Sequence, residues 1–159
     1  MDFETYAMSS RPSRGSFATK ISSVPHEEMT LDQRVAYCTN TMLQASVLFH
    51  KLHLKVNGQG AYAAHMALGG LYDAIPGLID GIVESYQGAA EVLLDFSIEN
   101  EESEEKTLNS VEDAISYIRE LYGKATMLQQ IIPYSEVVNE IDNLKSVLNS
   151  TKYKLLFLK

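Results

Sequence analysis

The chain has 159 residues, of which 45% are hydrophobic, and a formal net charge of −8. The length fits one domain with a single core. The acidic balance argues against a free-standing nucleic-acid binder, whose affinity comes from cationic side chains, and suits the attraction of metal cations. A lone cysteine, Cys38, excludes an internal disulfide framework. Because the chain also lacks a secretory signal and any apolar run near the ~20 residues of a membrane span, we expect a cytoplasmic protein that binds no membrane.

Residues 1–28 predict an extended or disordered N-terminal arm, because they contain two prolines and a serine-rich run but no helical period. We expect residues 29–159 to form the folded domain. The arm is mildly basic, which leaves open a weak contact with DNA or simple packing on the domain. Its basic residues are Arg11, Arg14 and Lys20.

The first predicted helix begins after Thr30. Thr30 and Gln33 have the types and spacing of a capping box, in which each side chain bonds the backbone N–H of the other residue. Apolar residues then recur at steps of three and four, which is typical of the buried face of a long helix. They are Val35, Cys38, Met42, Ala45, Phe49, Leu52 and Val56.

A tight turn at residues 57–60 separates this helix from a second one, predicted from about Gly60 to Gln87. Pro76 favours a kink in the second helix. Its many small residues have two interpretations: they let another helix approach closely, as at a two-fold interface, or they belong to the kink. They are Ala61, Ala63, Ala64, Ala67, Gly69 and Gly70.

The rest of the chain predicts an acidic crossover and two more helices. Residues 95–105 carry six carboxylates and are either a solvated loop or a cation-guiding segment. A third helix begins at Ser110 and stops before Pro133, and a fourth begins at about Ser135. Four apolar residues end the fourth helix, and we expect a partner chain to cover them: Leu155, Leu156, Phe157 and Leu158.

Two histidines and two carboxylates have the spacing of two half-sites. His53 and His65 flank the turn, so an antiparallel hairpin brings them level, whereas Asp80 and Glu84 share one face of the second helix. His65 and Asp80 stand ~22 Å apart along that helix, too far to bind one ion within one chain. Antiparallel packing of two chains brings the histidines of one onto the carboxylates of the other. Such mixed ligands suit Fe(II), Mn(II) or Zn(II).

The order and spacing of five residues resemble the Dps proteins, the mini-ferritins of the ferritin-like superfamily. The residues are His53, Gly58, His65, Asp80 and Glu84. The chain departs from that family in having Leu54 where an aromatic residue is usual and Gly69 where a carboxylate is often found.

The resemblance implies a fold and an activity. The fold is an all-α, four-helix ferritin-like bundle, up-down-down-up, with a long crossover between its second and third helices. The activity is oxidation of Fe(II) by peroxide or oxygen at ferroxidase sites formed by His53 and His65 of one subunit and Asp80 and Glu84 of its two-fold mate. Ferric iron is then stored inside a hollow dodecamer, which protects against oxidative damage. Asp73, seven residues before Asp80, is either an auxiliary ligand or a surface charge.

Two alternatives remain open beside the ferroxidase. One is a non-catalytic, ferritin-like structural or scaffolding protein, for example from a virus, which oligomerises without redox turnover. The other is a plain four-helix interaction module in which the four ligand-type residues coincide by chance. For the ferroxidase the cofactor is iron, with Zn²⁺ or Mn²⁺ as further metals, and weak or no DNA binding is expected.

Overall fold

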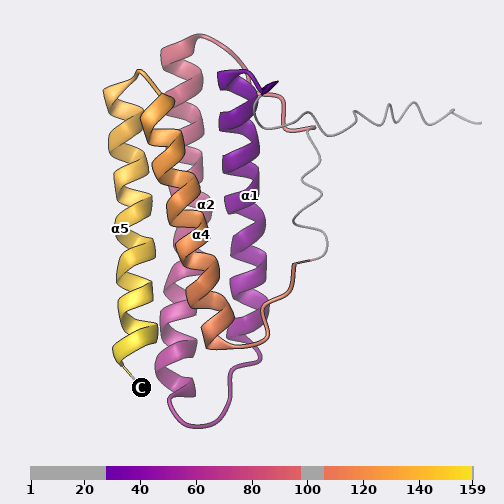
Figure 1. Cartoon of the computed structure of the whole chain (residues 1–159), viewed down its shortest axis with the longest axis vertical. Coiled ribbons are helices and arrows are strands. Elements are labelled where there is room, and N and C mark those ends of the chain that lie inside the picture. The colour runs from indigo at the N-terminus through magenta and orange to yellow at the C-terminus, as the bar shows by residue number, and fades with distance from the viewer. Residues whose placement is uncertain (1–27, 98–105, 159) are drawn as a thin grey trace, which may run out of the picture.

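The computed structural model describes residues 28–97 and 106–158. These residues form four long α-helices and contain no strand (Figure 1). The all-α, four-helix bundle predicted from the sequence is therefore confirmed. The predicted N-terminal arm, apart from Glu28, and most of the acidic crossover lie outside the described residues. The helices are α1 (Leu31–His53), α2 (Ala61–Ala90), α4 (Val111–Ile131) and α5 (Ser135–Phe157).

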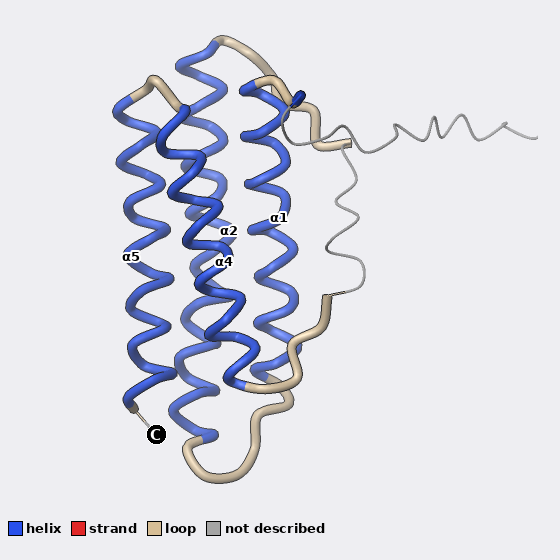
Figure 2. The backbone as a smooth tube through the Cα atoms, viewed as in Figure 1, coloured by secondary structure: helices blue, strands red, loops and turns tan. Residues whose placement is uncertain are grey.

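The helices pack side by side along one long axis. In Figure 1, α1 and α5 run towards the end of the bundle where the chain finishes, whereas α2 and α4 run the opposite way. Short turns join α1 to α2 and α4 to α5 (Figure 2). The end of α2 and the start of α4 lie at opposite ends of the bundle.

Two of the helices begin at capping boxes, one at the predicted pair of Thr30 and Gln33 and one at Ser110, where the sequence predicts the start of a helix. The Thr30 hydroxyl accepts from the Gln33 N–H at 3.2 Å, and the Gln33 side chain accepts from the Thr30 N–H at 2.9 Å. At the start of α4, the Ser110 hydroxyl accepts from the Asp113 N–H at 3.1 Å, and the Asp113 carboxylate accepts from the Ser110 N–H at 3.0 Å. The Asp113 carboxylate also accepts from the Asn109 N–H, and these backbone hydrogen bonds hold its pKa below the usual value.

The core is built from the apolar faces of all four helices. Phe49 of α1, Leu68 of α2, Ile118 of α4 and Val137 of α5 are fully buried. Cys38 belongs to this core as expected, and burial raises the pKa of its thiol. The predicted apolar stripes therefore mark the faces that meet at the centre of the bundle.

The longest helix, α2, carries the acidic half-site. It continues to Ala90, three residues beyond the predicted end, and contains Pro76 in its interior. Its C-terminal part is tied to α1 by the Tyr86 hydroxyl, which donates to the Asp32 carboxylate at 2.5 Å. Within the described ranges α2 is the one helix long and apolar enough to span a membrane, a test that core helices of soluble proteins also pass.

The C-terminal tip differs in part from the expectation of four exposed apolar residues. Leu155 packs into the core with 3% of its surface exposed, and Leu156 is half-buried. Phe157 and Leu158 are exposed by 69% and 48%. The difference arises because Leu155 continues the inward stripe of α5, in line with Thr151 and Leu148.

The capping box of α4 gives the first prediction. Ser110→Ala removes the side chain that accepts the Asp113 N–H, so we expect the free energy of unfolding to fall by about 1 kcal/mol. Ser116→Ala, on the exposed face of the same helix, should change it by less than about 0.5 kcal/mol. Chemical denaturation followed by circular dichroism measures both, and equal losses would contradict a capping role for Ser110.

Candidate functional site

The turn between α1 and α2 brings the two helix ends into register. Gly58 and Gly60 have φ values of +84° and +75°, a region that side chains rarely tolerate. The chain therefore reverses within a few residues, and α2 starts at Ala61 beside the end of α1. As the sequence predicts, His53 near the end of α1 and His65 near the start of α2 meet across this hairpin.

The two imidazole rings are stacked and hydrogen-bonded to each other's backbone. Their centroids lie 3.6 Å apart with an interplanar angle of 23°. His53 Nδ1 lies 2.8 Å from the His65 carbonyl oxygen, and His65 Nδ1 lies 3.0 Å from the His53 carbonyl oxygen. Because a carbonyl oxygen only accepts, each Nδ1 carries the proton and donates it.

These hydrogen bonds determine which ring atoms can bind a metal. With the proton on Nδ1, a neutral imidazole keeps its Nε2 lone pair free. Metal-binding histidines usually donate the N–H of the ring nitrogen that does not bind the metal to a backbone carbonyl or a carboxylate. This hydrogen bond orients the ring and raises the basicity of the nitrogen that binds the metal. His53 and His65 thus present two oriented nitrogen atoms of one chain that could bind a metal.

Gly69 makes room for the His53 ring. A Cβ atom placed on Gly69 would lie 3.3 Å from His53 Cε1 and 3.5 Å from His53 Nδ1. The first distance is tighter than an ordinary van der Waals contact, so the ring would have to move by a few tenths of an ångström. The residue that departs from the mini-ferritin pattern therefore supports the histidine pair in this chain, a role that the sequence alone did not reveal.

His50 belongs to an aromatic cluster beside the pair. Its ring stacks on Tyr72 at 4.1 Å, and Tyr72 meets His53 edge-on at 5.1 Å. The centroids of His50 and His53 are 6.0 Å apart. In the described part of the chain, no group of three or more His, Cys, Asp or Glu side chains is placed to hold a metal. Within residues 28–97 and 106–158, a single chain thus offers the imidazole pair without a third ligand.

The carboxylates lie on the outward face of α2. Asp80 and Glu84 are both exposed, and neither has a hydrogen bond or ion pair within the described residues. Asp73 is exposed on the same face, two turns earlier. The structure thus brings the two histidines together, but within one chain it leaves the carboxylates at the far end of the helix.

The same outward face is apolar around the histidine end. Tyr62 and Met66 are exposed by 79% and 56% on α2, Val47 by 52% on the neighbouring α1, and Leu54, the C-cap of α1, by 71%. Steps of one or two helical turns join the exposed residues of α2 into one stripe. The stripe comprises Tyr62, Met66, Asp73, Asp80 and Glu84. It is apolar at its start and acidic towards its end.

A further carboxylate from α5 approaches the acidic end of this stripe. Glu140 Oε2 would lie 3.5 Å from a Cβ atom on Gly81, the residue after Asp80. The same oxygen accepts from the Asn143 side chain at 3.2 Å. Sequence reasoning missed Glu140, because its proximity to α2 depends on how α5 packs. The sequence indicates only that Glu140 is a charged residue directly before Ile141, which belongs to the apolar face of α5.

The match to a family model covers residues 53–155, which is more than half of the chain. The family is described as one of unknown function, DUF5856. The chain belongs to this family. The matched segment of this DUF5856 chain contains both histidines and both carboxylates of the candidate site. No curated protein matches the chain, and no solved structure matches it.

The contact between Gly69 and His53 gives the second prediction. Gly69→Ala should displace the His53 ring and lengthen its hydrogen bond to the His65 carbonyl, so that the Nδ1 proton exchanges faster with water. Imidazole ¹⁵N and ¹H nuclear magnetic resonance measures this directly.

Gly123→Ala is the matched control, because Gly123 is exposed in the middle of α4 and a Cβ there meets nothing within 4 Å. It should leave the histidine signals unchanged and stabilise the helix by about 0.5–1 kcal/mol. Unchanged histidine signals in Gly69→Ala would refute the contact.

Proposed function

We propose that the protein is a Dps-like ferroxidase that binds Fe(II) at composite sites between two copies of the chain. The observation that carries the proposal is the pair of reciprocal hydrogen bonds between His53 and His65, which leaves both Nε2 atoms as oriented ligands. One chain supplies this pair, and a second chain supplies Asp80 and Glu84, the exposed carboxylates without a partner in the described structure.

A two-fold axis beside Asp73 would bring the histidine pair of one chain next to the carboxylates of the other. In an antiparallel pair of α2 helices, residues equally far from the axis on opposite sides face each other. His65 lies eight residues before Asp73, so it faces the level of residue 81 of the other chain, between Asp80 and Glu84. Each dimer then contains two equivalent sites. The two Asp73 carboxylates meet near the axis, where an additional cation would relieve their repulsion.

The proposed ligand set suits iron oxidation. Imidazole and carboxylate bind Fe(II), and the two carboxylates favour the ferric state because they offset its higher charge. In the proposed reaction, two Fe(II) ions each give one electron to hydrogen peroxide, which takes up two protons and leaves as two water molecules. Oxygen is the other candidate oxidant, and Zn²⁺ and Mn²⁺ are expected to compete for the same ligands.

The helix directions and the exposed apolar residues support a ferritin-like assembly. Antiparallel neighbours α1 and α2, and α4 and α5, with α2 and α4 parallel, agree with an up-down-down-up bundle that has a long crossover. Exposed Tyr62, Met66 and Phe157 are apolar groups that oligomerisation would cover. We propose two-fold dimers that assemble into a hollow dodecamer and store ferric iron in the cytoplasm, with weak or no DNA binding.

A non-catalytic ferritin-like scaffold is the second candidate. It is favoured by Gly69, which leaves the histidine half-site without the additional carboxylate that mini-ferritins often carry. In that case the composite site binds a metal that links the subunits structurally, and the protein does not catalyse oxidation of Fe(II).

Oxidation of Fe(II), followed through the ferric absorbance, separates these candidates and gives the third prediction. The wild-type protein should oxidise Fe(II) much faster than buffer alone. His65→Ala and Asp80→Ala should each reduce the rate at least about 100-fold, because each removes a ligand from both sites of a dimer.

Mixing the two variants tests whether the sites are shared. After joint refolding, half of the dimers are mixed, and each mixed dimer keeps one intact site with His65 from one chain and Asp80 from the other. The mixture should recover roughly a quarter of the wild-type rate. A mixture as inactive as its components would contradict a shared site, whereas full activity of both single variants would rule out the assignment altogether.

A further inference from the structure

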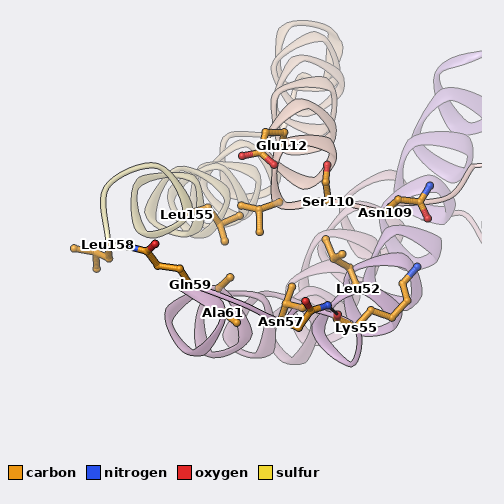
Figure 3. Close-up of a pocket in the computed structure, with 14 residues that line it drawn as sticks. Leu52, Lys55, Asn57, Gln59, Ala61, Asn109, Ser110, Glu112, Leu155 and Leu158 are labelled. Carbon is orange, nitrogen blue, oxygen red and sulfur yellow. Dashed lines mark hydrogen bonds between the residues drawn. The ribbon is translucent and has the colours of Figure 1, made fainter.

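A pocket lies at the end of the bundle where the α1–α2 turn, the start of α4 and the end of α5 meet (Figure 3). Its volume is about 320 Å³, within the range of small-molecule sites. None of the four residues of the proposed metal site lines it. The pocket is therefore a separate feature, and ligand binding there does not depend on iron chemistry.

The floor of the pocket is apolar. Leu52, Ala64 and Leu155 line it and are exposed by only 1%, 8% and 3%. Val56 and Val111, which also line it, are half-buried and pack against the core. An apolar group placed here would leave water and contact side chains that are already fixed by the core.

The hydrogen-bond donors around the mouth are largely used within the protein. Lys55 Nζ donates to the Leu108 carbonyl at 3.1 Å, and Figure 3 shows the end of the Lys55 side chain pointing away from the pocket. Asn57 Nδ2 donates to the Lys55 carbonyl at 3.1 Å, and Asn109 Nδ2 donates to Thr107 Oγ1 at 3.4 Å. The amide oxygen of Asn57 remains as an acceptor.

The mouth also holds a carboxylate without a partner. Glu112, in the first turn of α4, lines the pocket and is exposed, with no hydrogen bond or ion pair in the described chain. Gln59 lies across the mouth from it (Figure 3) and adds another amide oxygen. Lys55 also lines the pocket, but its ammonium group donates to Leu108, so Glu112 is the charged lining residue that makes no hydrogen bond or ion pair within the described residues. The complementary ligand therefore donates hydrogen bonds and is positively charged.

We propose that this pocket binds a small primary amine with an apolar body, such as an alkylammonium ion. The apolar part lies on Leu52, Ala64 and Leu155. The ammonium group has three N–H donors, which reach the Glu112 carboxylate and amide oxygens of the mouth. A carboxylate ligand of the same shape meets Glu112 with like charge, and an alcohol has no charge and only one O–H donor.

Titration of the full-length protein with three six-carbon probes tests the proposal: hexylammonium, hexan-1-ol and hexanoate. Isothermal calorimetry and methyl chemical shifts of Ala64 and Leu155 report binding. Hexylammonium should bind with a dissociation constant on the order of 1 mM or tighter, and the other two at least about tenfold more weakly.

Two variants and one control complete the test. Glu112→Gln keeps the shape and removes the charge, so it should weaken hexylammonium binding at least about tenfold. Ala61→Leu places a large side chain at a half-buried lining position and should abolish binding of all three probes. Glu136→Gln removes the matching exposed carboxylate in the first turn of α5, which does not line the pocket, and should change nothing.

The proposal is overturned if hexanoate or hexan-1-ol binds as tightly as hexylammonium, or if Glu112→Gln binds hexylammonium like the wild type. It is also overturned if none of the three probes shifts the Ala64 and Leu155 methyl signals at 10-fold excess over the expected dissociation constant, about 10 mM.

Discussion

Two imidazole rings stacked across a tight helical hairpin, each donating to the other's backbone carbonyl, are the constraint on which the candidate site depends. The hydrogen bonds of 2.8 and 3.0 Å hold His53 and His65 in one tautomer. They require the reversal at Gly58 and Gly60, where positive φ values bring the helix ends together. They also require Gly69, because a side chain there would press on the His53 ring. Three glycines that would each weaken an isolated helix or strand therefore position the two histidine rings here.

The same constraint explains why the described residues of one chain do not complete the proposed site. The hairpin fixes the imidazoles at one end of α2, and the rigidity of a continuous helix keeps Asp80 and Glu84 ~22 Å or more away. Their exposure on one outward stripe leaves them accessible to a second chain. In the proposed dimer, two antiparallel stripes would place the acidic end of each α2 helix beside the imidazole end of the other. Metal binding and subunit association would then support each other, since each composite site stabilises the dimer that creates it.

Sequence patterns predicted the features that depend on short-range chemistry. Thr30 forms the expected capping box, a helix begins at Ser110 as expected, the apolar periodicity marks the buried faces, and the Asn57–Gly60 turn brings His53 level with His65. Features that depend on packing between distant segments were not predictable. The contact of Glu140 with α2 and the role of Gly69 follow from helix positions that no local pattern encodes. The pocket at the end of the bundle likewise needs three segments that are far apart in the sequence.

The most direct test of a shared metal site is a crystal structure of the assembled protein soaked with Zn²⁺, a redox-inert substitute for Fe(II) with similar ligand preferences. Anomalous scattering then locates the metal directly. We expect Zn²⁺ within about 2.0–2.2 Å of Nε2 atoms of His53 and His65 from one chain and of carboxylate oxygens of Asp80 and Glu84 from its two-fold mate. Metal bound by ligands of a single chain, or histidines and carboxylates that lie in unrelated places across the assembly, would contradict a shared site.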